Sequence, residues 1–181
     1  VYLIESRGFL GGLGECIKLQ NGSICEKYYH HYFSHDNYLI EYCRKFLNKS
    51  PLFTTTSMSI FFKDKFYPWN SLFDIISTKL ISPLSKLRFL ISTLLLSTNI
   101  IPNKILDEIP LSKGMRRFYG FESYKKIWEP ITSAKFGNLV NEIPLTWMKG
   151  RLKQRVKSRK NGKEKLGFIK GSLLELTNSI H

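Results

Sequence analysis

Cysteines are few in this sequence of 181 residues, and they form no recognisable pairing motif. The three cysteines, Cys16, Cys25 and Cys43, include no C-x-x-C pair, and their odd number leaves one over. This pattern is not that of a disulfide framework and favours a reducing compartment. We therefore expect a cytoplasmic protein.

The sequence also lacks a recognisable metal-binding motif. Three of its histidines, His30, His31 and His35, lie in one short stretch, without the helical pairing and nearby acid that zinc hydrolases use. His31 and His35 are four residues apart, but Ser34 to Asp36 is typical of a helix cap. We therefore expect no metal.

No hydrophobic run is long enough for an ordinary transmembrane helix. The best candidate extends only from Leu87 to Ile101, includes Arg88, and falls short of the roughly 20 apolar residues that cross a bilayer. A buried helix is the preferred interpretation. Peripheral contact with a membrane surface is the alternative, since the surroundings are basic.

Acidic residues are scarce relative to basic ones. The chain has 28 Lys and Arg against 14 Asp and Glu, a net charge of +14. Such an excess is compatible with nucleic acid, an anionic membrane or an anionic substrate. The densest basic run, Lys149 to Lys165, has no interleaved aromatic residues that could stack on bases. We therefore interpret it as a solvated connector and expect no nucleic-acid partner.

The most informative stretch that is present is the first dozen residues. Val1 to Ile4 are apolar and run into Glu5, a pattern typical of a buried parallel strand whose carboxyl end reaches a ligand. A carboxylate at that position can accept both hydroxyls of a ribose. Gly11 and Gly12 follow, and glycines allow positive φ and a close backbone approach to phosphate.

This E-x5-G-G pattern resembles the second cofactor motif of the FAD-dependent family that includes amine oxidases, protoporphyrinogen oxidases, phytoene desaturases and UDP-galactopyranose mutases. The resemblance implies that Glu5 holds the ribose of FAD and that Arg7, Gly11 and Gly12 lie near the diphosphate. Ser6, between the acid and the arginine, is grouped with these cofactor-binding residues.

Later stretches resemble the same family in the same order. The E-K-Y-Y-H-H segment is similar to one that lines the flavin pocket, which implies that His30 and His31 belong to the flavin or substrate pocket. The alternative is that these side chains fill a domain interface. The W-E-P-x-x-x-x-K-F-G run at 128–137 resembles a marker of a bacterial subgroup, and residues 164–172 resemble the family's return segment.

The glycine-rich phosphate loop of such a fold would lie about 20 residues before the acid. The sequence begins at Val1, so we expect a piece of a longer protein, incomplete at both ends. The resemblance implies an α/β fold: a partial Rossmann-like FAD-binding domain in residues 1–50 and an inserted, mainly helical α+β substrate domain in 51–160. Residues 161–181 would return to the first domain.

The expected parent protein is an FAD-dependent oxidoreductase that transfers a hydride from a C–N or C–C bond of a small substrate to flavin. An anionic substrate is compatible with the positive charge. No Ser/His/Asp or paired-carboxylate arrangement stands out, so we assign no catalytic residue. Two alternatives stay open: a non-catalytic remnant without flavin, and a basic module that binds an anionic membrane or nucleic acid.

Local patterns predict the elements. Asn21-Gly22 predicts a hairpin with a type I′ turn between residues 15–20 and 23–26, and Lys63 to Lys65 predicts another between 57–62 and 66–69. Helices are expected at 36–47, 71–80, 83–101, 110–119, 121–128, 147–160 and 172–180. Pro130 is expected to break a helix and Gly137 to cap one.

Overall fold

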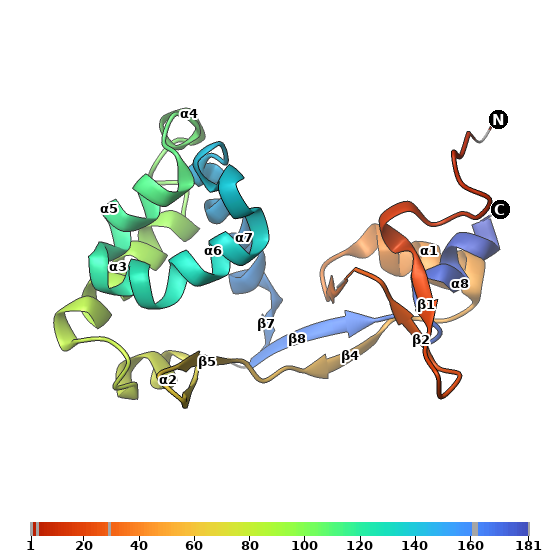
Figure 1. Ribbon diagram of the computed structural model, residues 1–181, viewed down its shortest axis with the longest axis horizontal. Helices are drawn as coiled ribbons and strands as arrows, with labels where there is room; N and C mark the ends of the chain where they lie inside the picture. Colours follow the sequence, from red (N-terminus) through yellow and green to blue (C-terminus); the bar gives the residue numbers. More distant parts are fainter. Residues whose placement is uncertain (1, 3, 29, 161–162, 181) are drawn as a thin grey trace. The chain divides into compact units, whose positions relative to one another are not determined.

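The computed structural model describes the chain except residues 1, 3, 29, 161, 162 and 181. The chain forms two units (Figure 1). The sheet unit comprises residues 1–56 and 165–181, and the helical unit comprises residues 57–164. The predicted domain boundaries lie a few residues earlier, and the roles assigned to those domains remain predictions.

The strands of the sheet unit are short and antiparallel. β1 (Cys16–Lys18) pairs with β2 (Ile24–Glu26), and β8 (Lys163–Phe168) lies between β3 (Tyr32–Phe33) and β4 (Leu52–Thr55). The loop between β1 and β2 is wider than the predicted type I′ turn. Its backbone bonds join Leu19 to both Gly22 and Ser23, with Gly22 at φ 83°, so a three-residue loop with a left-handed glycine replaces the two-residue turn.

Two helices pack together in the sheet unit: α1 (Asn37–Leu47) and α8 (Leu173–Ile180). The predicted stripe of α1 is buried around Cys43, which is 1% exposed and packs with Ile169 and Leu176. The three cysteines are free thiols. This small core is what holds the sheet unit together.

The helical unit begins with a hairpin. β5 (Ser59–Phe62) pairs with β6 (Lys65–Pro68), and Lys63 and Asp64 between them both have positive φ, as a type I′ turn requires. The helices and short helical turns that follow are α2 (Leu72–Ser77), α3 (Pro83–Ser97), α4 (Asn103–Asp107), α5 (Leu111–Ser123), η2 (Tyr124–Trp128), α6 (Glu129–Phe136), η3 (Gly137–Asn141) and α7 (Leu145–Ser158).

The core of the helical unit lies where α3, α5 and α7 pack against one another (Figure 1). Leu96, Leu106, Leu111, Met115, Tyr119 and Leu145 are fully buried there. Local signals position the helices: Ser71 and Asp74 form a capping box at α2, and Ser82 with Pro83 begins α3 as predicted.

The expected break between the helices at 110–119 and 121–128 is confirmed, because Gly120, with φ 80° and ψ 166°, has a non-helical backbone inside α5, and the helical path then continues through η2. Two other expectations in the helical unit were wrong. Pro130 lies in the first turn of α6, where its missing N–H costs nothing, so it does not break a helix. The basic run is not a solvated connector, because α7 buries Met148, Lys149 and Leu152.

The expected strand at the start of the chain is not formed by the described residues. Tyr2 and Ile4 are 97% and 94% exposed and lie outside any strand. A strand without a neighbour leaves its backbone groups unpaired and its apolar side chains in water, so it is not stable alone. The fold is mixed α and β, and every strand pair in the described part is antiparallel.

No helix in the described part of the chain could span a membrane. None of them combines the length and the apolar composition needed to cross a bilayer.

Candidate functional site

Glu5 leads the predicted cofactor-binding segment, and its carboxylate is exposed. One oxygen accepts hydrogen bonds from the Arg7 N–H at 3.0 Å and from Ser6 Oγ at 3.4 Å. The Arg7 N–H bond lowers the pKa of Glu5, so this carboxyl is ionised at neutral pH. It forms no salt bridge with any described residue and therefore has oxygens available to a ligand.

Arg7 is already paired. Its Nη1 lies 2.7 Å from Glu15 Oε2, and Lys27 Nζ lies 3.1 Å from Glu15 Oε1. The Lys27 hydrogen bond, helped by Arg7, lowers the pKa of Glu15 despite some desolvation. The two cations outnumber the carboxylate, so a net positive charge stays beside the Glu5 segment. The sequence motif does not include Glu15. Its position between Arg7 and Lys27 is evident only in the folded chain.

Gly11 and Gly12 form the turn that the motif predicted to need glycine. Their φ values are 138° and 52°, and a Cβ at Gly11 would lie 3.3 Å from the Glu15 backbone. The turn continues into the short helix η1 (Gly12–Gly14), closed by the Gly14 N–H on the Gly11 oxygen at 2.7 Å. The left-handed backbone at both positions favours glycine over any residue with a side chain.

His30 lies in a separate place in the sheet unit. It lines a hollow of about 380 Å³ together with Glu26 and residues 168–172. The Nδ1 of His30 is 3.5 Å from Glu26 Oε2, while Glu26 Oε1 accepts the Leu173 N–H at 3.1 Å. The imidazole is therefore placed by a carboxylate that also holds the first residue of α8.

His31 packs among aromatic rings rather than beside His30. Its ring meets Phe33 edge-on at 5.2 Å, and Phe33 stacks on His35 at 5.4 Å. Burial raises the pKa of the neighbouring Tyr32 phenol, which keeps that group neutral. The two histidines thus have different neighbours, Glu26 and Phe33, and their assignment to a flavin or substrate pocket stays a prediction.

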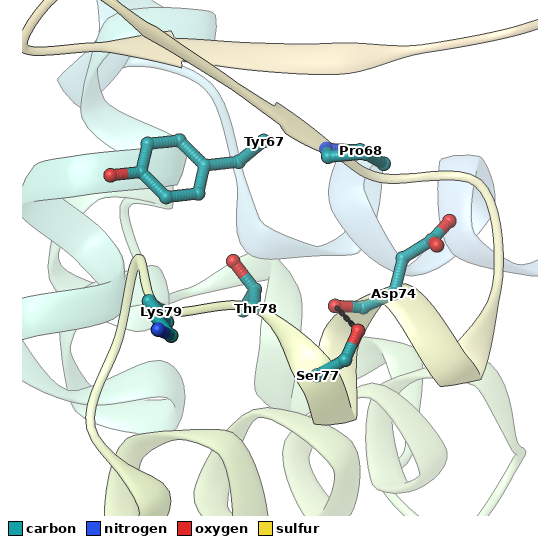
Figure 2. Close-up of a pocket in the computed structure, with 6 residues that line it drawn as sticks. All are labelled: Tyr67, Pro68, Asp74, Ser77, Thr78 and Lys79. Atoms are coloured by element: carbon teal, nitrogen blue, oxygen red, sulfur yellow. Dashed lines mark hydrogen bonds between the residues drawn. The ribbon is translucent and has the colours of Figure 1, made fainter.

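The helical unit contains a small polar pocket of about 230 Å³ (Figure 2). Figure 2 shows Tyr67, Ser77, Thr78 and Lys79 around it, with the Asp74 side chain turned toward the start of its helix. The Asp74 carboxylate accepts the N–H groups of residues 70 and 71, and the Asn70 bond is the main reason its pKa is lowered. This carboxylate serves as a helix cap and is not available as a general base.

A larger apolar pocket of about 530 Å³ lies elsewhere in the helical unit. Its wall combines aromatic rings with aliphatic side chains of α2, α3 and α7, and Arg155 and Arg159 also line it. Phe89 is central: its ring stacks on Trp128 at 5.7 Å and meets Trp69 edge-on at 5.3 Å. Pockets of this size and composition are typical of small-molecule sites.

Sequence reasoning missed this apolar pocket. Trp69 and Trp128 were noted only as parts of family-like motifs, and the arginines only as members of a basic run. Arg155 lies in the last turn of α7, whereas Arg159 begins the short strand β7 (Arg159–Lys160), so a helical spacing could not have brought the two together. Nothing in the sequence alone indicates that the two tryptophans, far apart in the chain, face one cavity.

Metal-binding chemistry is not suggested by the described residues. Among them, no three His, Cys, Asp or Glu side chains come together as a possible ligand set. When the chain is compared with protein-family models and with curated proteins, no family and no curated protein matches it.

Proposed function

We propose that this chain forms part of an FAD-dependent oxidoreductase of the amine oxidase type. In this proposal the segment from Glu5 to Gly12 contacts the adenosine and diphosphate of FAD, and the helical unit holds a small substrate. A Rossmann-like arrangement of the first domain is part of the proposal. The flavin would take a hydride from a C–N or C–C bond of the substrate.

The observation that carries the proposal is the state of Glu5. It is an ionised carboxylate without a salt bridge, six residues before a left-handed glycine turn. A ribose diol can donate two hydrogen bonds to such a group, and the charge strengthens both. Gly11 and Gly12 bring backbone close to a ligand without a side chain in the way.

The charges around Arg7 fit the same ligand. Arg7 and Lys27 share the single carboxylate of Glu15, so these three side chains carry an excess of one positive charge at neutral pH, next to the negative charge of Glu5. A diphosphate brought near the glycine turn would be attracted by that excess. Arg7 could then exchange a weak, exposed ion pair for a charge-assisted bond to phosphate.

The first prediction concerns Glu5. We expect the parent protein, extended upstream to include the phosphate loop, to bind FAD, and Glu5→Gln in it to weaken that binding at least tenfold, since an amide oxygen accepts ribose hydroxyls less strongly than a carboxylate does. Equilibrium dialysis of FAD, followed by its visible absorbance, measures both values. The matched control is Glu41→Gln, which removes an equally exposed acid from α1 and should leave binding unchanged.

Two results would contradict the proposal. If the extended parent protein retains no FAD, the non-catalytic remnant becomes the better description. If Glu5→Gln and Glu41→Gln bind FAD equally, Glu5 does not hold the ribose, and any flavin bound is held elsewhere.

A further inference from the structure

Two residues that line the apolar pocket of the helical unit have hydrogen-bond donors that no described group satisfies. The indole Nε1 of Trp128 and the Nε of Arg159 are both buried, and neither has a hydrogen-bond partner among the described residues. Buried N–H groups in folded proteins nearly always have a partner. Two orphan donors that belong to residues lining one cavity indicate that an acceptor is supplied by something bound there.

Arg155 and Arg159 bring positive charge to the wall of this pocket. Arg155 lies 3.7 Å from Glu164 Oε2, and its Nη1 also contacts the Met58 sulfur at 3.4 Å. Glu164 is buried and also accepts the Ser158 hydroxyl at 3.2 Å. Arg159 forms no ion pair with a described residue. The Glu164 carboxylate therefore balances Arg155 alone, which leaves the positive charge of Arg159 at the pocket without a paired carboxylate among the described residues.

The remainder of the wall is apolar. Leu90 and Leu94 from α3, Ile75 and Ile76 from α2, and Leu152 from α7 surround the aromatic rings. Thr93 and Ser97 also line the pocket, but their hydroxyls already have partners: Thr93 Oγ1 lies 3.2 Å from the Tyr119 hydroxyl, and Ser97 Oγ donates to the Leu94 oxygen at 3.0 Å. A fully polar anion would leave this wall against water or empty space, whereas a hydrocarbon body would cover it.

We propose that this pocket binds an amphiphilic monocarboxylate, with its hydrocarbon body against Phe89, Trp69 and Trp128 and its carboxylate at Arg159. A carboxylate matches the side-on fork of a guanidinium, where Nε and one terminal nitrogen donate together. One negative charge balances the excess of one guanidinium. The site lies wholly within the helical unit, and the inference does not depend on the flavin proposal.

Dodecanoate is a suitable probe, with dodecanol as its uncharged counterpart. Titration calorimetry on the full chain measures both. We expect dodecanoate to bind at micromolar concentration and dodecanol at least tenfold more weakly, because the alcohol cannot form the charge-assisted pair. Equal affinity for the two would overturn the proposal, and so would the absence of dodecanoate binding.

Substitutions at Arg159 test whether the dodecanoate carboxylate binds there. Arg159→Gln removes the charge while keeping an amide donor, and we expect it to weaken dodecanoate at least tenfold and dodecanol less than twofold. Arg159→Lys should recover part of the affinity. The control is Lys157→Gln, which removes an exposed charge of α7 that does not line the pocket and should change neither affinity. If Arg159→Gln and Lys157→Gln behave alike, general positive charge explains the binding and the assigned site is wrong.

Discussion

Glu122 shows how one side chain can join several parts of the helical unit. One carboxylate oxygen accepts the Ser82 N–H at 3.1 Å and the Ser82 and Ser85 hydroxyls at 2.7 Å each. The other oxygen accepts Lys126 Nζ at 2.7 Å. Desolvation opposes ionisation, but these donors together lower the pKa of Glu122 to about 2. The carboxylate thereby links the start of α3 to α5.

We expect Glu122→Gln to lower the free energy of unfolding at pH 7 by about 1–2 kcal/mol, a value reduced for the partial exposure of the carboxylate. Because the folded pKa lies below the unfolded value of 4.5, the contribution is complete above that value and is lost as the pH falls toward about 2. Urea unfolding at pH 7 and pH 3 should show the difference between wild type and variant narrowing.

The control for this experiment is Glu142→Gln, which changes an exposed carboxyl with no side-chain hydrogen bond among the described residues. Its effect should be small and independent of pH over the same range. A difference for Glu122→Gln that stays constant between pH 7 and pH 3 would mean that the hydrogen-bonded network does not stabilise the ionised form.

At the scale of helices, the contact of α5 with α7 depends on a glycine. A Cβ placed on Gly114 would lie 2.6 Å from the Leu145 side chain. We expect Gly114→Ala to destabilise the helical unit by about 1–3 kcal/mol, because the packed Leu145 must move. Thermal or urea unfolding followed by tryptophan fluorescence measures this.

Gly150 is the matched control within α7. Nothing lies within 4 Å of a Cβ placed there, and the residue is exposed in the helix. Gly150→Ala should therefore stabilise the protein by roughly 0.5–1 kcal/mol through helix propensity alone. If both substitutions stabilise, the α5–α7 contact has more room than the structure indicates.

Elements with strong local signals were predictable from the sequence. The helix at 36–47, the start of a helix at residue 83 and the hairpin connected through residues 63–65 are encoded within a few residues, and all three were confirmed, although Lys65 already belongs to a strand. The Gly137 cap was also correct, with φ 55°. Caps and turns depend on nearby backbone geometry, so short windows of sequence are sufficient for them.

Elements that depend on distant contacts were not predictable. Lys149 was interpreted as a solvated cation, yet it is 3% exposed and its Nζ donates to the Ile101 oxygen and to Asn103 at 2.6 and 2.8 Å. Its partners lie far away in the sequence, so no local pattern reveals them. The same holds for the apolar pocket. A sequence motif was sufficient to identify Glu5 and the glycine turn. It could not show whether the Glu5 carboxylate is paired with another side chain.

At the scale of the whole molecule, the two units have cores of very different size. The helical unit buries a large cluster that includes Leu96, Leu111 and Met115, whereas the buried core of the sheet unit is Cys43, Ile169 and Leu176. Stability rises with the apolar area that a core removes from water. We therefore expect the sheet unit to unfold first.

Natural probes distinguish the two transitions. Trp69, Trp128 and Trp147 all lie in the helical unit, while the buried thiol of Cys43 reports on the sheet unit. In a variant with Cys16→Ser and Cys25→Ser, Cys43 should react with a thiol reagent at lower urea than the midpoint of the fluorescence change. Coincident transitions would show that the two units unfold as one.

The pairing of β4 with β8 has a topological consequence. Thr55 pairs with Lys165, so the helical unit takes the place of the turn in an antiparallel hairpin of the sheet unit. While the helical unit is folded, it acts as a short connector between β4 and β8. Once it melts, the same strands are joined by a long flexible loop, whose closure costs roughly 3 kcal/mol more. Loss of the larger unit would thus destabilise the smaller one, and by thermodynamic linkage the folded smaller unit stabilises the larger one by the same free energy.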